Sequence, residues 1–207
     1  MSEEKKLRLY ASLMEEVKLR LDCTSAALNG RTGFPNPIVR EFCYLQLRML
    51  CELIALGCLV AHGDIASLQS HRTGRAYSAE EILARLSELR PHFYPIACKQ
   101  TRIQVGSSFE FELNILHPQP LPKEDLLSLY GKTHKFLHRG NIKKLLSSAT
   151  SIDMEINLPE ISSWGQKIAN HLAIQMIAIS EKKVMLCTLR NADDNHRVQV
   201  ATAKKPE

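Results

Sequence analysis

The chain has 207 residues, of which 44% are hydrophobic and 24% are charged, and its net charge is +5 at pH 7. These values are typical of a folded globular protein and exclude a disordered, collagen-like or low-complexity chain. The small positive excess permits an acidic partner without requiring one.

Six cysteines are present, and none of them forms a Cys-x-x-Cys pair. Cys43, Cys51 and Cys58 fall on one expected helix, which holds them too far apart to be bridged to one another. We therefore expect reduced thiols and a cytoplasmic protein. The N-terminus lacks the apolar core of a signal peptide, and charges interrupt the most apolar segment, 38–61, so we expect no membrane span.

Helices are predicted where apolar residues recur at spacings of three and four. Asn36 is expected to cap the second helix at its N-terminus, and Ser78 with Glu81 forms a capping box before the third. The predicted helices cover residues 3–28, 37–62, 79–90, 122–140 and 159–180, with a short extra helix at 142–146.

Two segments alternate between apolar and polar residues, which is typical of strands with one buried face. They predict β-hairpins near 99–116 and 183–203. In the first hairpin the buried face would carry Phe109, Phe111, Leu113 and Ile115, and Arg102 would lie beside Glu110 or Glu112 on the outer face.

The elements predict a mainly α (α+β) fold. It would be a single-domain helical bundle of about five helices with two β-hairpins. The proline-rich segment near 118 is the one candidate boundary within it.

The helix expected at 37–62 carries its charged and polar side chains on one side. At 100° per residue they fall within a sector of about 120°, and the rest of the surface is almost wholly apolar. Such a helix belongs at the centre of a bundle. The residues of this polar stripe are Arg40, Glu41, Tyr44, Arg48, Glu52 and His62.

Three interpretations of the polar stripe stay open. Arg48 and Glu52 are spaced to pair across one turn, so the charges can satisfy one another in a buried or half-buried network that fixes the helix register. Alternatively, the stripe lines one wall of a pocket for a polar ligand. A third interpretation places it in solvent or against a second copy of the chain.

A basic cluster occupies the end of the helix expected at 122–140. Residues 130–144 contain five Lys or Arg and two His. These cations can simply complement the helix dipole, or they can contact RNA or another phosphate-bearing ligand. His134 and His138 share a helix face, but no third metal ligand is apparent, so we expect no metal. The candidate binding residues are Lys132, His134, Lys135, Arg139, Lys143 and Lys144.

The segment 130–140 resembles a helix of the HEPN superfamily, whose members are small helical bundles, many of them ribonucleases with an Arg…His motif. The resemblance covers about a dozen residues. It would imply a metal-independent ribonuclease that uses His138. The sequence departs from the motif because only Gly131, Lys132 and Thr133 precede His138 at the allowed distances, so lysine would replace the arginine.

No nucleophile elbow, phosphate loop or dinucleotide fingerprint is present in the sequence. We therefore expect a binding or regulatory protein without catalytic activity or a cofactor. It would contact a polyanion through the basic helix end and could form a homodimer. The alternative hypothesis is the HEPN-like ribonuclease acting through His138.

Overall fold

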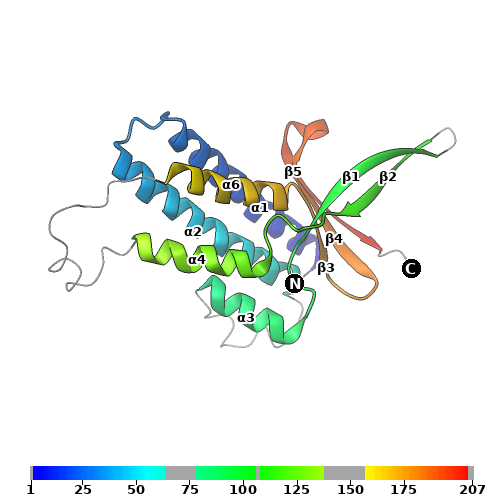
Figure 1. Cartoon of the computed structure of the whole chain (residues 1–207). Coiled ribbons are helices and arrows are strands. Elements are labelled where there is room, and N and C mark those ends of the chain that lie inside the picture. Colours follow the sequence, from blue (N-terminus) through cyan, green and yellow to red (C-terminus); the bar gives the residue numbers. More distant parts are fainter. Residues whose placement is uncertain (1, 64–77, 106–107, 138–156, 205–207) are drawn as a thin grey trace.

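The computed structural model describes residues 2–63, 78–105, 108–137 and 157–204. Figure 1 shows the helices gathered on one side and the strands on the other. The helices are α1 (Glu3–Leu28), α2 (Asn36–Ala61), α3 (Ala79–Leu89), α4 (Lys123–Leu137) and α6 (Leu158–Leu172). The strands are β1 (Ile96–Val105), β2 (Ser108–Ile115), β3 (Ile174–Ala178), β4 (Lys183–Asn191) and β5 (Arg197–Lys204).

The five strands form one antiparallel sheet in the order β2-β1-β3-β4-β5. The fold is therefore mixed α+β, and the expectation of a helical bundle with two separate hairpins is corrected. Strand β3 joins the hairpins, although the sequence pattern predicted helix for residues 159–180. The helix ends at Leu172 because Gln175 and Ile177 alternate into the core while the backbone pairs with β1 and β4. Such tertiary pairing overrides local helical spacing.

Helix α2 lies at the centre of the helical layer and contacts α1, α3, α4 and α6. This position confirms the expectation from its apolar surface. A Cβ added to Gly57 would lie 3.2 Å from Tyr10 Cε2, so α1 and α2 approach closely at this point. The helix begins one residue earlier than expected: Pro35 occupies the N-cap position and Asn36 lies inside the first turn.

Helix α1 connects the two layers. Tyr10, Met14, Val17 and Leu21 pack into the core, and the Tyr10 hydroxyl donates to Gln175 Oε1 on β3 at 3.1 Å. Residues on both sides of position 118 contribute to this one hydrophobic core.

The β1–β2 hairpin extends away from the helices (Figure 1). Only Ile96 and Ala97 of β1 pair with β3. The expected buried face is wrong: Phe111 is 62% exposed and Ile115 is 44% exposed. Arg102 lies opposite Phe111 rather than beside the glutamates. The reason is the extent of the sheet, because β3 begins at Ile174 and reaches only the first residues of β1.

Candidate functional site

A groove of about 570 Å³ lies between the C-terminal half of α1 and one face of α6. The adjoining ends of β3 and β4 close it on one side. Its lining is mostly small, amide or hydroxyl side chains above an apolar base. The residues are Leu21, Asp22, Thr24, Ser25, Leu28, Asn29, Ser162, Gly165, Gln166, Ala169, Asn170, Ala173, Ile174, Thr188, Leu189 and Arg190.

The periodicity of α6 creates one wall of the groove. Ile161, Ile168 and Leu172 are buried on an adjoining side of this helix. The groove-facing residues recur at spacings of three and four, which places them on one helix face. They are Ser162, Gly165, Gln166, Ala169, Asn170 and Ala173.

Gly165 leaves open space in this wall. A Cβ added there would meet no heavy atom within 4 Å. Glycine in a helix interior costs about 1 kcal/mol relative to alanine. No contact among the described residues therefore requires glycine at this position, although the groove is wider for its presence.

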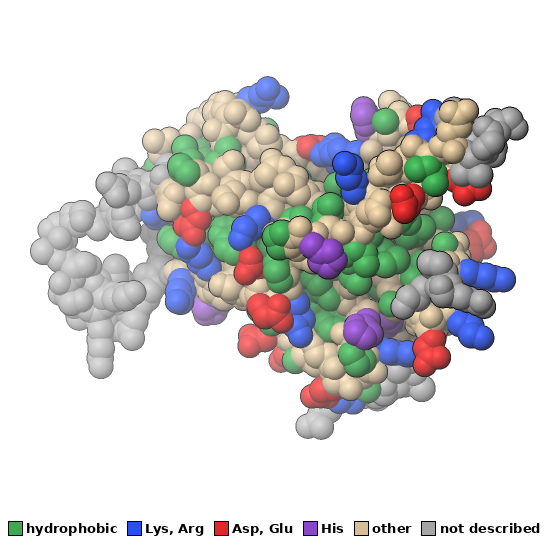
Figure 2. All heavy atoms as spheres, turned by 45° about the vertical axis from the view of Figure 1, so that its right-hand side comes forward, with side chains coloured by type: hydrophobic (Ala, Val, Ile, Leu, Met, Phe, Trp, Pro, Cys, Tyr) green, Lys and Arg blue, Asp and Glu red, His purple; other side chains and the backbone are tan. Residues whose placement is uncertain are grey.

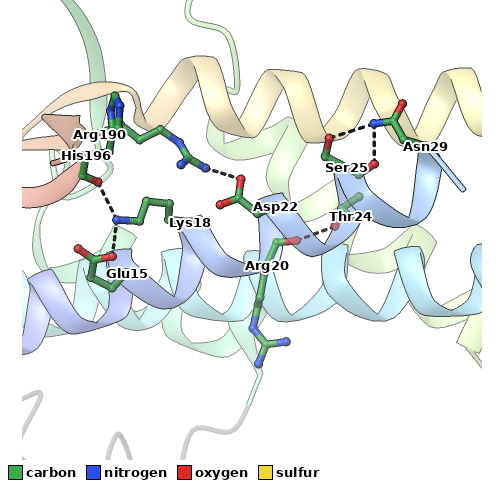
Figure 3. Close-up of polar contacts among 9 residues, drawn as sticks. All are labelled: Glu15, Lys18, Arg20, Asp22, Thr24, Ser25, Asn29, Arg190 and His196. Atoms are coloured by element: carbon green, nitrogen blue, oxygen red, sulfur yellow. Dashed lines mark hydrogen bonds and ion pairs between the residues drawn. The ribbon is translucent and has the colours of Figure 1, made fainter. Parts of the chain in front are cut away.

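The polar groups of the groove are mainly neutral. Asn29 Nδ2 donates to Ser25 Oγ at 3.4 Å on α1, and Gln166 Nε2 donates to Asn170 Oδ1 at 2.6 Å on α6. Asp22 and Arg190 supply the charges of the lining, and they form an ion pair of 2.6 Å. Figure 3 shows Asp22 and Ser25 pointing toward α6, whereas Arg20 points toward α2. This lining suits hydrogen bonding to an uncharged ligand better than binding of an ion.

Next to the groove, α1 contacts the β4–β5 hairpin (Figure 3). Lys18 Nζ donates to the His196 carbonyl oxygen at 2.8 Å, and the Val198 amide donates to Glu15 Oε1 at 2.8 Å. His196 has a φ of 59°, in the left-handed region that is uncommon for residues other than glycine. These bonds fix α1 against the sheet and so fix the groove's shape.

The polar stripe of α2 faces α4. Arg48 Nε and Glu52 Oε1 lie 3.2 Å apart, with side chains 25% and 24% exposed. The Tyr130 hydroxyl, from α4, accepts from Arg48 at 2.7 Å and donates to Glu52 at 3.3 Å. The predicted half-buried pair is confirmed, and this part of the stripe is a structural network between two helices.

The other stripe residues divide into two groups. Tyr44 and His62 are buried, whereas Arg40 and Glu41 are half-buried. The Tyr44 ring stacks on Phe136 of α4, with ring centroids 4.0 Å apart and planes 9° apart. The Arg40 guanidinium lies 5.9 Å from the same Phe136 ring. The stripe therefore joins α2 to α4 along much of its length.

The basic cluster lies only partly within the described residues. Lys132 forms an ion pair with Glu160 of α6, and His134 and Lys135 are exposed on α4. The candidates outside the described residues are His138, Arg139, Lys143 and Lys144, together with the short helix expected at 142–146.

The six cysteines are all free thiols. Burial raises the pKa of Cys43 to about 11 and that of Cys187 to about 12. Thiols with such raised pKa values are poor nucleophiles at neutral pH. Across the described ranges, no three His, Cys, Asp or Glu side chains gather as metal ligands.

Sequence reasoning did not identify the groove. The small and amide residues that recur on α6 could have indicated a groove-lining face. The prediction for this helix used only its apolar residues, which indicate the buried face. The α1 and β4 walls had no such signal, since only folding brings Asp22 to Arg190.

A comparison of the chain with known protein families, with curated proteins and with solved structures found no match. Among the described helices, α2 is long and apolar enough to cross a membrane by length and composition. Of its most apolar window, 61% is buried inside the protein, as in the core helix of a folded domain.

Proposed function

We propose that this chain is a non-catalytic binding protein that holds an uncharged ligand in the groove between α1 and α6. The groove's volume of about 570 Å³ is in the range of small-molecule sites, roughly 300–1,000 Å³. Its apolar base would contact one side of the ligand, and its amide and hydroxyl groups would form hydrogen bonds to the other side.

The main support for this proposal is the presence of glycine at position 165, in the interior of α6. Glycine destabilises the helix at this position relative to alanine, yet an alanine Cβ would meet no heavy atom within 4 Å. An alanine methyl group would project into the groove. The proposal explains the glycine as room for a ligand atom close to the α6 backbone.

Chemical-shift mapping on the isotope-labelled protein tests the proposal with two sets of fragments, neutral amides and alcohols in one and charged carboxylates and amines in the other. We expect neutral fragments to shift the backbone amides of Ser25, Gly165, Ala169 and Thr188. Charged fragments should leave those amides unchanged.

Gly165→Ala should weaken fragment binding about tenfold, because an added methyl group costs on the order of 1 kcal/mol or more in a filled site. Gly131→Ala is the matched control: it also lies in a helix with nothing within 4 Å of an added Cβ, but on α4. Equal effects of the two changes, or shifts confined to other surfaces, would contradict the proposal.

A second proposal, polyanion binding at the end of α4, is favoured by the exposed side chains of His134 and Lys135 and by the Arg40 guanidinium, which lies 5.9 Å from the ring of Phe136 on the same helix end. RNA binding there should weaken steeply with salt. Lys135→Ala should reduce affinity more than Lys132→Ala, because Lys132 is already paired with Glu160. Equal losses, or no binding at low salt, would contradict it.

The ribonuclease hypothesis can be tested in the same RNA samples, with EDTA present. Cleavage that disappears in His138→Ala would support it and would contradict the non-catalytic proposal. If the RNA stays intact in the presence of the unchanged protein, the ribonuclease hypothesis is contradicted. Light scattering on the same preparation tests the proposed homodimer.

A further inference from the structure

The outer edge of β2 has no strand beside it in the described structure. β2 is the terminal strand of the sheet and pairs only with β1. Backbone groups on such an edge are available to pair with another extended chain. The hairpin also extends away from the helices (Figure 1).

The two faces of β2 differ in chemistry. Phe111, Leu113 and Ile115 alternate along one face, and all three are exposed or half-buried. Glu110 and Glu112 are exposed on the opposite face. Figure 2 shows hydrophobic, acidic and basic side chains next to the grey tip of the hairpin.

The two carboxylates form no ion pair with the described side chains of the hairpin. The residues directly opposite them on β1 are Ile103 and Thr101, which are uncharged. None of the ion pairs formed within the described parts of the chain includes Glu110 or Glu112. An added strand would therefore meet two uncompensated negative charges on one face and apolar side chains on the other.

A second copy of β2 is a poor occupant of this edge, because the strand contains no Lys or Arg that could pair with Glu110 and Glu112. In a symmetric antiparallel pair, each face of one strand continues into the same face of the other. Pairing centred on Phe111 would place Glu110 opposite Glu112 twice, and centring on Glu112 would place that residue opposite itself. Like charges directly opposite each other destabilise a strand pair.

We propose that the outer edge of β2 docks an extended segment of another protein in which Lys or Arg residues alternate with apolar residues. The basic side chains would lie beside Glu110 and Glu112. The apolar side chains would cover Phe111 and Leu113, and main-chain hydrogen bonds would extend the sheet by one strand. This inference is independent of the α1–α6 groove.

Fluorescence polarisation with a short labelled peptide of alternating lysine and valine tests the proposal. The full-length protein should bind this peptide and not its glutamate–valine counterpart. The double variant Glu110→Lys with Glu112→Lys should weaken binding of the lysine peptide at least about tenfold, since two attractive cross-strand pairs become repulsive. The same variant should gain affinity for the glutamate peptide.

Asp193→Lys with Asp194→Lys is the matched control, because it changes the net charge equally on the exposed turn between β4 and β5. It should retain binding of the lysine peptide. If both double variants lose affinity equally, attraction is unspecific and the proposal is overturned.

A peptide N-methylated at the residues that donate to β2 tests strand addition on the unchanged protein, without relying on any variant to fold. It should not bind. Full affinity of this peptide would overturn the proposal. So would light scattering that finds a dimer of the chain abolished by the Glu110→Lys and Glu112→Lys changes, since a second copy would then occupy the edge.

Discussion

The His171 imidazole is kept uncharged by its surroundings. It is fully buried, and Nε2 lies 3.1 Å from the Pro95 carbonyl oxygen, which can only accept, so Nε2 carries the proton. Nδ1 is buried without a hydrogen-bond partner, and the Tyr94 ring lies beside the imidazole. Burial lowers the His171 pKa from 6.5 to about 4.

The free energy of unfolding should therefore depend on pH through His171. Between pH 6.5 and 4 the unfolded chain takes up a proton that the folded protein excludes, so stability falls as the pH is lowered through this window. The stabilisation is fully present above pH 6.5, and its loss is at most about 3 kcal/mol. Urea melts at pH 7 and pH 4.5 should show a smaller loss for His171→Gln than for the unchanged protein. Equal losses would contradict this prediction.

The Arg48–Glu52–Tyr130 network should contribute more than a surface ion pair and less than a fully buried one. Its side chains are about one-quarter exposed, and the Tyr130 hydroxyl bonds both charges. We expect Arg48→Met and Glu52→Gln each to lower the free energy of unfolding by about 1 kcal/mol. A double-mutant cycle with Tyr130→Phe measures the coupling. Changes below about 0.5 kcal/mol in both single variants would indicate an energetically neutral contact.

At the scale of elements, α1 and α2 depend on a small residue where they approach most closely. Gly57 faces Tyr10 and Met14, which an added Cβ would meet at 3.2 Å and 3.4 Å. α1 and α2 pack together in the core of the helical layer. α1 also forms one wall of the groove.

Gly57→Val should lower the free energy of unfolding by about 1–3 kcal/mol, because its extra carbons overpack the contact between α1 and α2. Gly131→Val makes the same change on α4, where nothing lies within 4 Å of the added Cβ, and should cost much less. Thermal melts compare the two. A similar loss in both variants would mean that the close approach at Gly57 does not limit the packing.

Across the whole molecule, thiol accessibility reports on the integrity of the core. Cys43, Cys51, Cys58, Cys98 and Cys187 are buried, and Cys23 is half-buried. Burial raises the pKa of each of the five buried thiols, so few of them are ionised at neutral pH.

A thiol reagent should react rapidly with at most Cys23 in the native protein and with six groups in denaturant without a reductant. Gly57→Val should expose further thiols if it loosens the core. Two or fewer reactive groups in denaturant would indicate disulfides and contradict both the structure and the expected reducing compartment.

Elements whose signals are local could be predicted from the sequence. Helix α1 was predicted at its observed bounds, and the Ser78 cap of α3 forms as expected, with Ser78 Oγ accepting from the Glu81 amide at 3.1 Å. The Arg48–Glu52 pair followed from its four-residue spacing on α2. These features depend on periodicity and capping, which involve only residues close together in the sequence.

The sheet and the groove depend on contacts between separate elements, which no local pattern specifies. Residues 174–178 become a strand because β1 and β4 supply partners for their backbone; β4 follows directly in the chain, but the β1 residues lie nearly 80 positions earlier. Phe111 is exposed because no other element reaches its face of the hairpin among the described residues, although its alternating pattern is that of a buried strand. The groove forms because α1, α6 and β4 converge; the α6 wall has a periodic pattern of its own, but that pattern does not reveal which elements will lie opposite it.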